Sequence, residues 1–151
     1  MTLFSRTLVA LFFFACSYAA FATHNEAGEI TICYIGTQGE PLYQVTIITH
    51  TNPQSPADRP EFILDWGDNA TDTIPRTSSQ VMIIAGIEVQ RNLYVSTHLY
   101  PGPGVYILQY IDPNRVAGVV NMDGSVSVPM CVQTQLIIGV SGNDCTPTFL
   151  N

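Results

Sequence analysis

Short runs of alternating hydrophobic and polar residues dominate the chain after its first 22 residues, and helical periodicity is almost absent. The runs are rich in Val, Ile, Thr and Tyr and are separated by Gly, Pro, Asn and Asp, which is typical of β-strands joined by turns. The alternation predicts strands at 29–35, 42–50, 61–66, 80–88, 92–99, 104–111 and 125–139.

The same alternation assigns a buried face to several of these strands. The residues predicted to face inward are Tyr43, Val45 and Ile47, then Phe62, Leu64 and Trp66, and finally Val126, Val128, Met130, Val132, Leu136 and Ile138. Pro129 lies inside the last run and indicates an edge strand or a break, because proline cannot donate a ladder hydrogen bond. We expect an all-β fold, an antiparallel two-sheet sandwich of the Ig-like class, with an open barrel as the alternative.

The N-terminus indicates export. Arg6 precedes an apolar run that ends in the small-residue pattern Ala20-Phe21-Ala22, which predicts a signal peptide over residues 1–22 with cleavage near Ala22. The run is shorter than the roughly 20 residues of a membrane span, so no membrane insertion is expected after cleavage. A lipoprotein site at Cys16 is the alternative. Residues 23–151 are then a single secreted or cell-surface domain, whose C-terminal end could begin a linker to a further module.

Charge narrows the classes of partner. After removal of Arg6, four arginines stand against 12 acidic residues, a net charge of −8, and the chain has no lysine. Such a chain has little with which to neutralise phosphates, so nucleic acid and anionic membranes are not expected partners.

Three cysteines remain after signal removal, which predicts one disulfide in an oxidising compartment and one leftover thiol. Cys131 and Cys145 are closest in sequence, but Cys33 could pair with either of them. A buried, unpaired cysteine is the alternative reading for Cys33 or Cys131.

The stretch ILDWGDNATDTIP, residues 63–75, gathers Asp65, Asp68 and Asp72 around the only tryptophan. Asp68 and Asn69 suit a turn, because short polar side chains bond nearby backbone amides and tolerate left-handed geometry. A calcium site on Asp65, Asp68 and Asp72 is the sharper alternative, although the chain has no DxDxDG loop. No other cofactor is expected.

Catalytic patterns are missing from the sequence. It contains no GxSxG elbow, no HExxH and no glycine-rich phosphate loop, and no spacing identifies a glycosidase carboxylate pair. His24, His50 and His98 are far apart in sequence, so no triad can be assigned. We therefore predict that the protein is not an enzyme.

Two modification patterns lie in the same stretch, residues 63–75, which we call the acidic turn. Asn69-Ala70-Thr71 fits the N-glycosylation sequon. Asp72-Thr73-Ile74 is similar to the acceptor for O-glycosylation in Bacteroidetes, which would place a glycan on Thr73.

Three motifs follow one another along the chain: WGDN at 66–69, STHLY at 96–100 and PGPGVYIL at 101–108. Their order resembles the polycystic kidney disease (PKD) domain, whose pattern is a WGDG-like turn followed by HxY and PGxYxV. The residues that carry the resemblance are Trp66, Gly67, Asp68, His98, Tyr100, Gly104 and Tyr106. The resemblance implies that the tryptophan packs inside an Ig-like sandwich and that Tyr106 and Leu108 fill its core. Asn69 replaces the usual glycine and also accepts positive φ.

A second resemblance covers nearly the whole chain after residue 22. Its segments are THNEAGEIT, SPADRPEFILDWGD, NLYVSTHLYPGPGVYIL, DPNRVAGVVNM and SVSVPMCVQTQLII. They resemble the N-terminal module of gliding-motility-associated surface proteins of Bacteroidetes, which continue through Ig-like modules to a type IX secretion sorting domain. Glu26 replaces the usual arginine, and the chain ends at Asn151 without a sorting domain. This implies a fragment or a truncated paralogue.

The function expected from these observations is a non-catalytic extracellular or cell-surface module, structural or adhesive, that contacts neighbouring modules or glycans. The alternative is a carbohydrate-binding or accessory module of a secreted hydrolase. Its candidate sugar-stacking residues are Tyr94, Tyr100, Tyr106 and Tyr110. A fibre subunit completed by strand exchange at 24–35 and 125–139 is a third reading.

Overall fold

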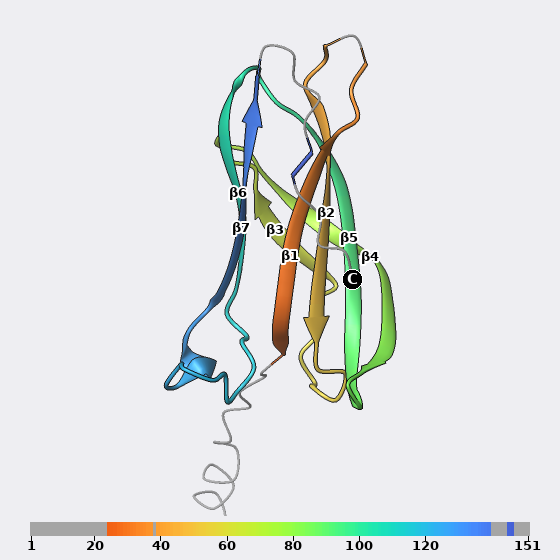
Figure 1. Ribbon diagram of the computed structural model, residues 1–151, viewed down its shortest axis with the longest axis vertical. Helices are drawn as coiled ribbons and strands as arrows, with labels where there is room; N and C mark the ends of the chain where they lie inside the picture. Colours follow the sequence, from red (N-terminus) through yellow and green to blue (C-terminus); the bar gives the residue numbers. More distant parts are fainter. Residues whose placement is uncertain (1–23, 38, 140–144, 147–151) are drawn as a thin grey trace, which may run out of the picture.

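The protein is a single antiparallel sheet of seven strands, seen in a computed structural model that describes residues 24–37, 39–139 and 145–146 (Figure 1). The strands are β1 (Asn25–Tyr34), β2 (Leu42–Thr51), β3 (Glu61–Asp65), β4 (Thr71–Ile84), β5 (Ile87–Leu99), β6 (Gly104–Asp112) and β7 (Met130–Ile138). Their order across the sheet is β1-β2-β5-β4-β3-β6-β7. The predicted all-β, antiparallel class is confirmed. The signal peptide, its cleavage site and the last residues of the chain, where the suggested linker would begin, lie outside the described residues.

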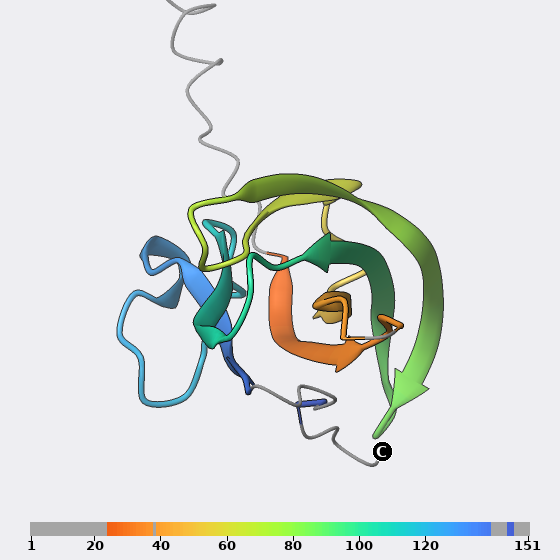
Figure 2. The ribbon, with the colours of Figure 1, turned by 90° about the horizontal axis from the view of Figure 1, so that it is seen from above.

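Strand β4 joins the two halves of the sheet. Its first part, Thr71–Pro75, pairs with β3, and its second part, from Arg76 to Ile84, pairs with β5 across a register shift between Arg76 and Ser78. Seen from above, the sheet curls until β7 approaches β1, the strand at the opposite end of the order (Figure 2). The strands therefore do not separate into the two independent sheets of the predicted sandwich, because β4 belongs to both halves.

The core fills the inside of this curled sheet, and the buried residues follow the predicted alternation. Tyr43, Val45, Ile47, Leu64 and Trp66 are fully buried. In the last strand Met130, Leu136 and Ile138 are buried, whereas Val128 is 38% exposed. The predicted inward parity is thus confirmed within the strands and fails at Val128, which lies before β7 and is not paired in the sheet.

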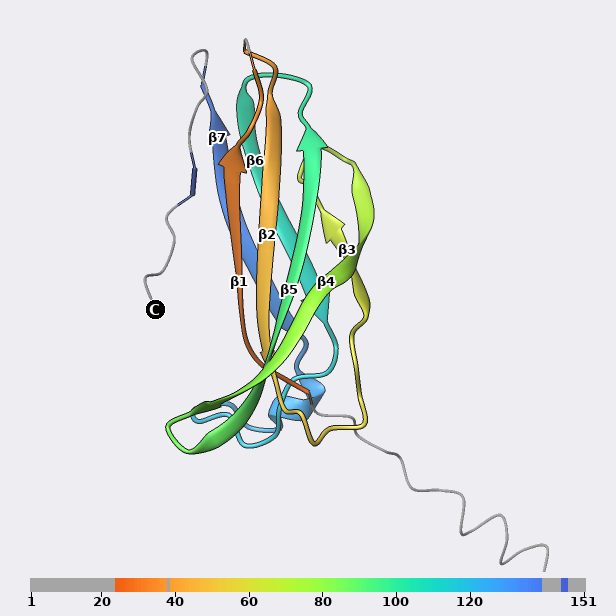
Figure 3. The same ribbon diagram turned by 90° about the vertical axis from the view of Figure 1, so that its right-hand side faces the viewer.

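The predicted strands 29–35 and 92–99 begin four and five residues too late, since β1 starts at Asn25 and β5 at Ile87, and two other predicted strands are wrong in more than their first residues. The run 80–88 contains a turn, because β4 ends at Ile84 and β5 begins at Ile87, and β4 also starts nine residues earlier than predicted, at Thr71 instead of Gln80. The resulting β4–β5 hairpin extends beyond the neighbouring strands (Figure 3). The run 125–139 is broken by Pro129, which separates the short 3-10 helix η1 (Ser125–Ser127) from the edge strand β7.

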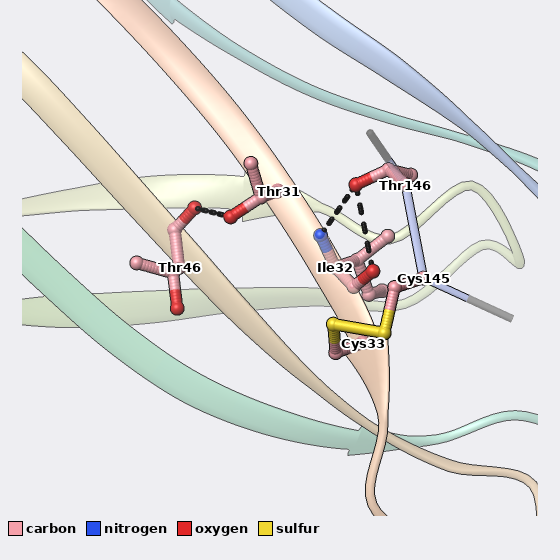
Figure 4. Close-up of a disulfide and its surroundings, with 6 residues drawn as sticks. All are labelled: Thr31, Ile32, Cys33, Thr46, Cys145 and Thr146. Atoms are coloured by element: carbon pink, nitrogen blue, oxygen red, sulfur yellow. Dashed lines mark hydrogen bonds between the residues drawn. A yellow bond between two sulfur atoms is a disulfide. The ribbon is translucent and has the colours of Figure 1, made fainter. Parts of the chain in front are cut away.

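The disulfide joins Cys33 to Cys145, not Cys131 to Cys145, so the pairing suggested by sequence proximity is wrong (Figure 4). Cys145 is brought beside β1, and Thr146 exchanges hydrogen bonds with Ile32 there. The Thr146 N–H donates to the Ile32 carbonyl at 2.8 Å, and the Thr146 hydroxyl accepts from the Ile32 N–H at 2.8 Å (Figure 4). Cys131 is a free, exposed thiol on β7. Cys145 meets Cys33 through an isolated antiparallel bridge to β1, and proximity along the chain does not indicate this contact.

Candidate functional site

The acidic turn is built around Trp66, which follows β3 and is fully buried. Its indole Nε1–H donates a 2.8 Å hydrogen bond to Asp72 Oδ2, and its backbone N–H donates to the Ala70 carbonyl at 3.0 Å. These two bonds stabilise the turn that connects β3 to β4. A buried indole N–H without an acceptor would be costly, so Asp72 is the group that allows the tryptophan to be buried.

Two residues of the turn adopt left-handed backbone conformations. Gly67 has φ 82°, and a Cβ at this position would lie 2.6 Å from the backbone nitrogen of Ile107 on β6. Only glycine combines this conformation with such a close approach. Asn69 has φ 73°, which confirms that asparagine takes the left-handed position expected for it.

The other two aspartates are also bonded within the turn. Asp65 Oδ1 accepts from the Gly67 N–H at 2.9 Å. Asp68 Oδ1 accepts from the Ala70 N–H at 3.0 Å, and Asp68 Oδ2 lies 2.8 Å from Nε2 of His98. Burial of the Asp68 carboxyl acts to raise its pKa, but the hydrogen bonds from His98 and Ala70 outweigh it, so this pKa is lowered from its ordinary value. Asp68 is therefore ionised at neutral pH.

Aromatic rings pack against the turn from β5 and β6. The His98 ring stacks on Trp66 with centroids 4.5 Å apart. The Tyr100 hydroxyl donates to the Trp66 carbonyl at 3.3 Å, and its ring lies 4.4 Å from that of Tyr106. The Tyr106 hydroxyl in turn donates to the Gly102 carbonyl at 2.9 Å. The motif residues, far apart in sequence, thus form one contiguous group.

The three carboxylates do not converge as a calcium site would require. Asp65, Asp68 and Asp72 bond different partners, and nowhere in the described ranges do three or more His, Cys, Asp or Glu residues gather in a way that could hold a metal ion. Since calcium takes six to eight oxygen ligands, the geometry gives the calcium hypothesis no support.

The tyrosines suggested for sugar stacking are buried, which makes that assignment wrong. Tyr94 and Tyr110 are at most 1% exposed, Tyr100 is 2% exposed and Tyr106 is 9% exposed. They face inward, so no sugar ring can reach their faces. Of the predicted glycosylation positions, Asn69 and Thr73 are both exposed, and their modification stays a prediction.

A charged cluster that sequence reasoning missed lies at the other end of the sheet. Arg59 donates two hydrogen bonds to the buried Asp112, at 2.8 and 3.1 Å. Arg76 similarly pairs with Asp58, and the buried ring of His24 is influenced by all four charges. Burial lowers the pKa of His24, with Asp112 and Asp58 opposing the shift. Asp58 and Arg59 come from the loop before β3, whereas Arg76, Asp112 and His24 come from other parts of the chain, so no spacing along the chain signals the cluster.

Comparisons of this chain with models of protein families, with curated proteins and with solved structures found no significant match. Over the part of the chain that the structure describes, no helix has the length and apolar character needed to cross a membrane.

Proposed function

We propose that the protein is a non-catalytic extracellular module that spaces or presents neighbouring domains at a cell surface, and that its sheet is a variant of the PKD-like Ig sandwich. The observation that carries the proposal is the use of the acidic turn. Every carboxylate there accepts a bond that holds the chain in place, from the indole of Trp66, from His98 or from a backbone N–H. The three carboxylates therefore stabilise the turn, and no substrate is needed to explain their positions.

The disulfide supports the extracellular part of the proposal. Cys33 and Cys145 are 112 residues apart in sequence, and such bridges persist mainly in oxidising compartments. The resemblance to surface-protein modules and the predicted signal peptide point the same way. Family membership in the PKD or gliding-motility groups remains part of the proposal.

Catalysis is tested with the purified chain, a panel of glycans and peptides, and two substitutions of Asp65. We expect no turnover. If turnover is found, Asp65→Ala removes both the charge and the acceptor for the Gly67 N–H, whereas Asp65→Asn removes only the charge. Loss of turnover in both variants, with folding intact by circular dichroism, would show that the carboxylate does chemistry and would overturn the proposal.

Location is tested in the native host with antibodies raised against the purified domain. Protease added to intact cells should remove the antigen, and the recovered protein should begin near Thr23 and carry the Cys33–Cys145 bridge by mass spectrometry. Antigen that is protected until lysis, with an intact Met1 and reduced cysteines, would contradict an extracellular role.

A further inference from the structure

The second part of β4 is paired with β5 on one side only, and its other side has no partner strand among the described residues. β3 pairs with β4 only as far as Pro75, and the last backbone bond on that side runs from the Arg76 N–H to the Pro60 carbonyl. Among the described residues, only those of β5 pair with the segment of β4 from Ser78 to Ile84. A strand segment with one unpaired side is an edge, although β4 lies fourth in the strand order.

The register identifies the backbone groups on this open edge. Ala85 and Gly86, with φ 50° and 82°, form a two-residue hairpin turn closed by the pair Ile84 and Ile87. Hydrogen-bonded and non-hydrogen-bonded pairs alternate from that closing pair. Ser79, Val81 and Ile83 therefore direct their N–H and C=O groups away from β5, toward the open side.

The side chains of this hairpin are apolar and exposed on both faces. On one face Val81 is 53% and Ile83 is 74% exposed, and on the other Ile84 is 46% and Ile87 is 63% exposed. No charged residue occurs between Arg76 and Glu88. Natural edge strands are normally protected by charge, proline or a covering segment, and residues 78–84 have none of these among the described parts of the chain. The hairpin also extends clear of the neighbouring strands (Figure 3).

We propose that this open edge of β4, residues 78–84, is a dimerisation site that pairs with the same edge of a second copy. An antiparallel strand edge is complementary to itself about a two-fold axis, so one surface serves both partners. The two hairpins then form a continuous four-stranded arm, β5-β4-β4-β5. Valine and isoleucine side chains from both copies cover each other on the two faces of this arm.

The absence of charge on the hairpin and the self-complementarity of its edge favour a second copy as the occupant. Without its first 22 residues the chain carries a net charge of −8, so two copies repel each other elsewhere on their surfaces. The uncharged hairpin is a place where they can approach without placing like charges opposite each other. A basic partner would gain nothing from this edge, because it offers no carboxylate to bind.

The test measures self-association by sedimentation velocity over a concentration series. All proteins carry Cys131→Ser, so that the exposed thiol cannot produce a covalent dimer. Ile83→Lys places a charge on the edge, and Val81→Pro removes an outward N–H while leaving the bonds to β5 in place. Thr73→Lys is the matched control, because it adds the same charge to β4 where β3 covers the strand.

We expect the parent protein and Thr73→Lys to form dimers of equal affinity. In Ile83→Lys and Val81→Pro the dissociation constant should rise on the order of tenfold or more, with unchanged circular dichroism. Hydrogen exchange at Ser79, Val81 and Ile83 should slow as protein concentration rises. A parent protein that stays monomeric throughout, or a dimer in which these three amides still exchange rapidly, would overturn the proposal.

Discussion

The imidazole of His98 lies flat on the indole of Trp66, with ring centroids 4.5 Å apart and an interplanar angle of 9°. His98 belongs to β5 and Trp66 follows β3, so the stack joins two strands that are not paired with each other. Asp68 Oδ2 contacts Nε2 at the edge of the same imidazole. The residues most suggestive of chemistry in the sequence thus connect the two halves of the curled sheet.

Asp72→Ala should destabilise the protein because it leaves the buried Nε1–H of Trp66 without its acceptor. We expect the free energy of unfolding to fall by about 1–3 kcal/mol. Asp72→Asn keeps a carbonyl oxygen at this position and should lose less. Urea unfolding followed by tryptophan fluorescence measures this free energy, and the signal comes from the turn itself, since Trp66 is the only tryptophan. Equal stability of Asp72→Ala and the parent protein would mean that the indole bond contributes nothing.

Gly67→Ala and Gly39→Ala form a matched pair, because the two glycines have φ of 82° and 83°. Both variants carry the cost of a left-handed alanine, roughly 1 kcal/mol. At Gly39 a Cβ meets nothing within 4 Å, whereas at Gly67 it would lie 2.6 Å from a backbone atom of Ile107. Gly67→Ala should therefore lose clearly more stability in denaturant unfolding. Equal losses would show that φ alone matters at Gly67.

Removing the disulfide should cost stability because Cys33 and Cys145 close a loop spanning a sequence separation of 112 residues. The chain-entropy estimate for such a loop is about 5 kcal/mol, an upper value if the reduced chain retains structure. The double variant Cys33→Ser, Cys145→Ser should melt at a much lower temperature, while Cys131→Ser should melt like the parent. Peptide mapping without reduction gives an independent check, and a peptide linking Cys131 to Cys145 would contradict the pairing.

Acid should weaken the protein through His24, whose ring is 2% exposed and whose two nitrogens have no hydrogen-bond partner among the described residues. Burial holds its folded pKa below the ordinary value of 6.5. When pH falls through 6.5 the unfolded chain takes up the proton first, so this stabilisation is present above 6.5 and is lost toward the folded pKa.

The measurement is the melting temperature between about pH 7.5 and pH 5, a range that brackets the ordinary histidine pKa. His24→Phe keeps an aromatic ring and has nothing to protonate, so its melting temperature should fall less over this range than that of the parent. An identical slope in both proteins would show that His24 does not titrate on unfolding.

Alternation along the chain was enough to predict an all-β fold and the inward-facing sides of several strands, and the residue types of Asp68 and Asn69 predicted the turn after Trp66. These are local properties, since a pleated strand buries every second residue whatever its neighbours are. The left-handed backbone conformation of Asn69 is also a local property, because a short polar side chain stabilises that conformation by itself.

The hairpin at Ala85 and Gly86, the Cys33–Cys145 bridge and the open edge of β4 could not be read from the chain. The run 80–88 is apolar on both sides of its turn, so its periodicity resembles one continuous strand. Disulfide pairing and edge exposure depend on which strands lie side by side, and β4 changes its neighbours at a register shift after Arg76. Alternation identifies the face that a residue occupies, but the identity of the adjacent strand arises only when the sheet assembles.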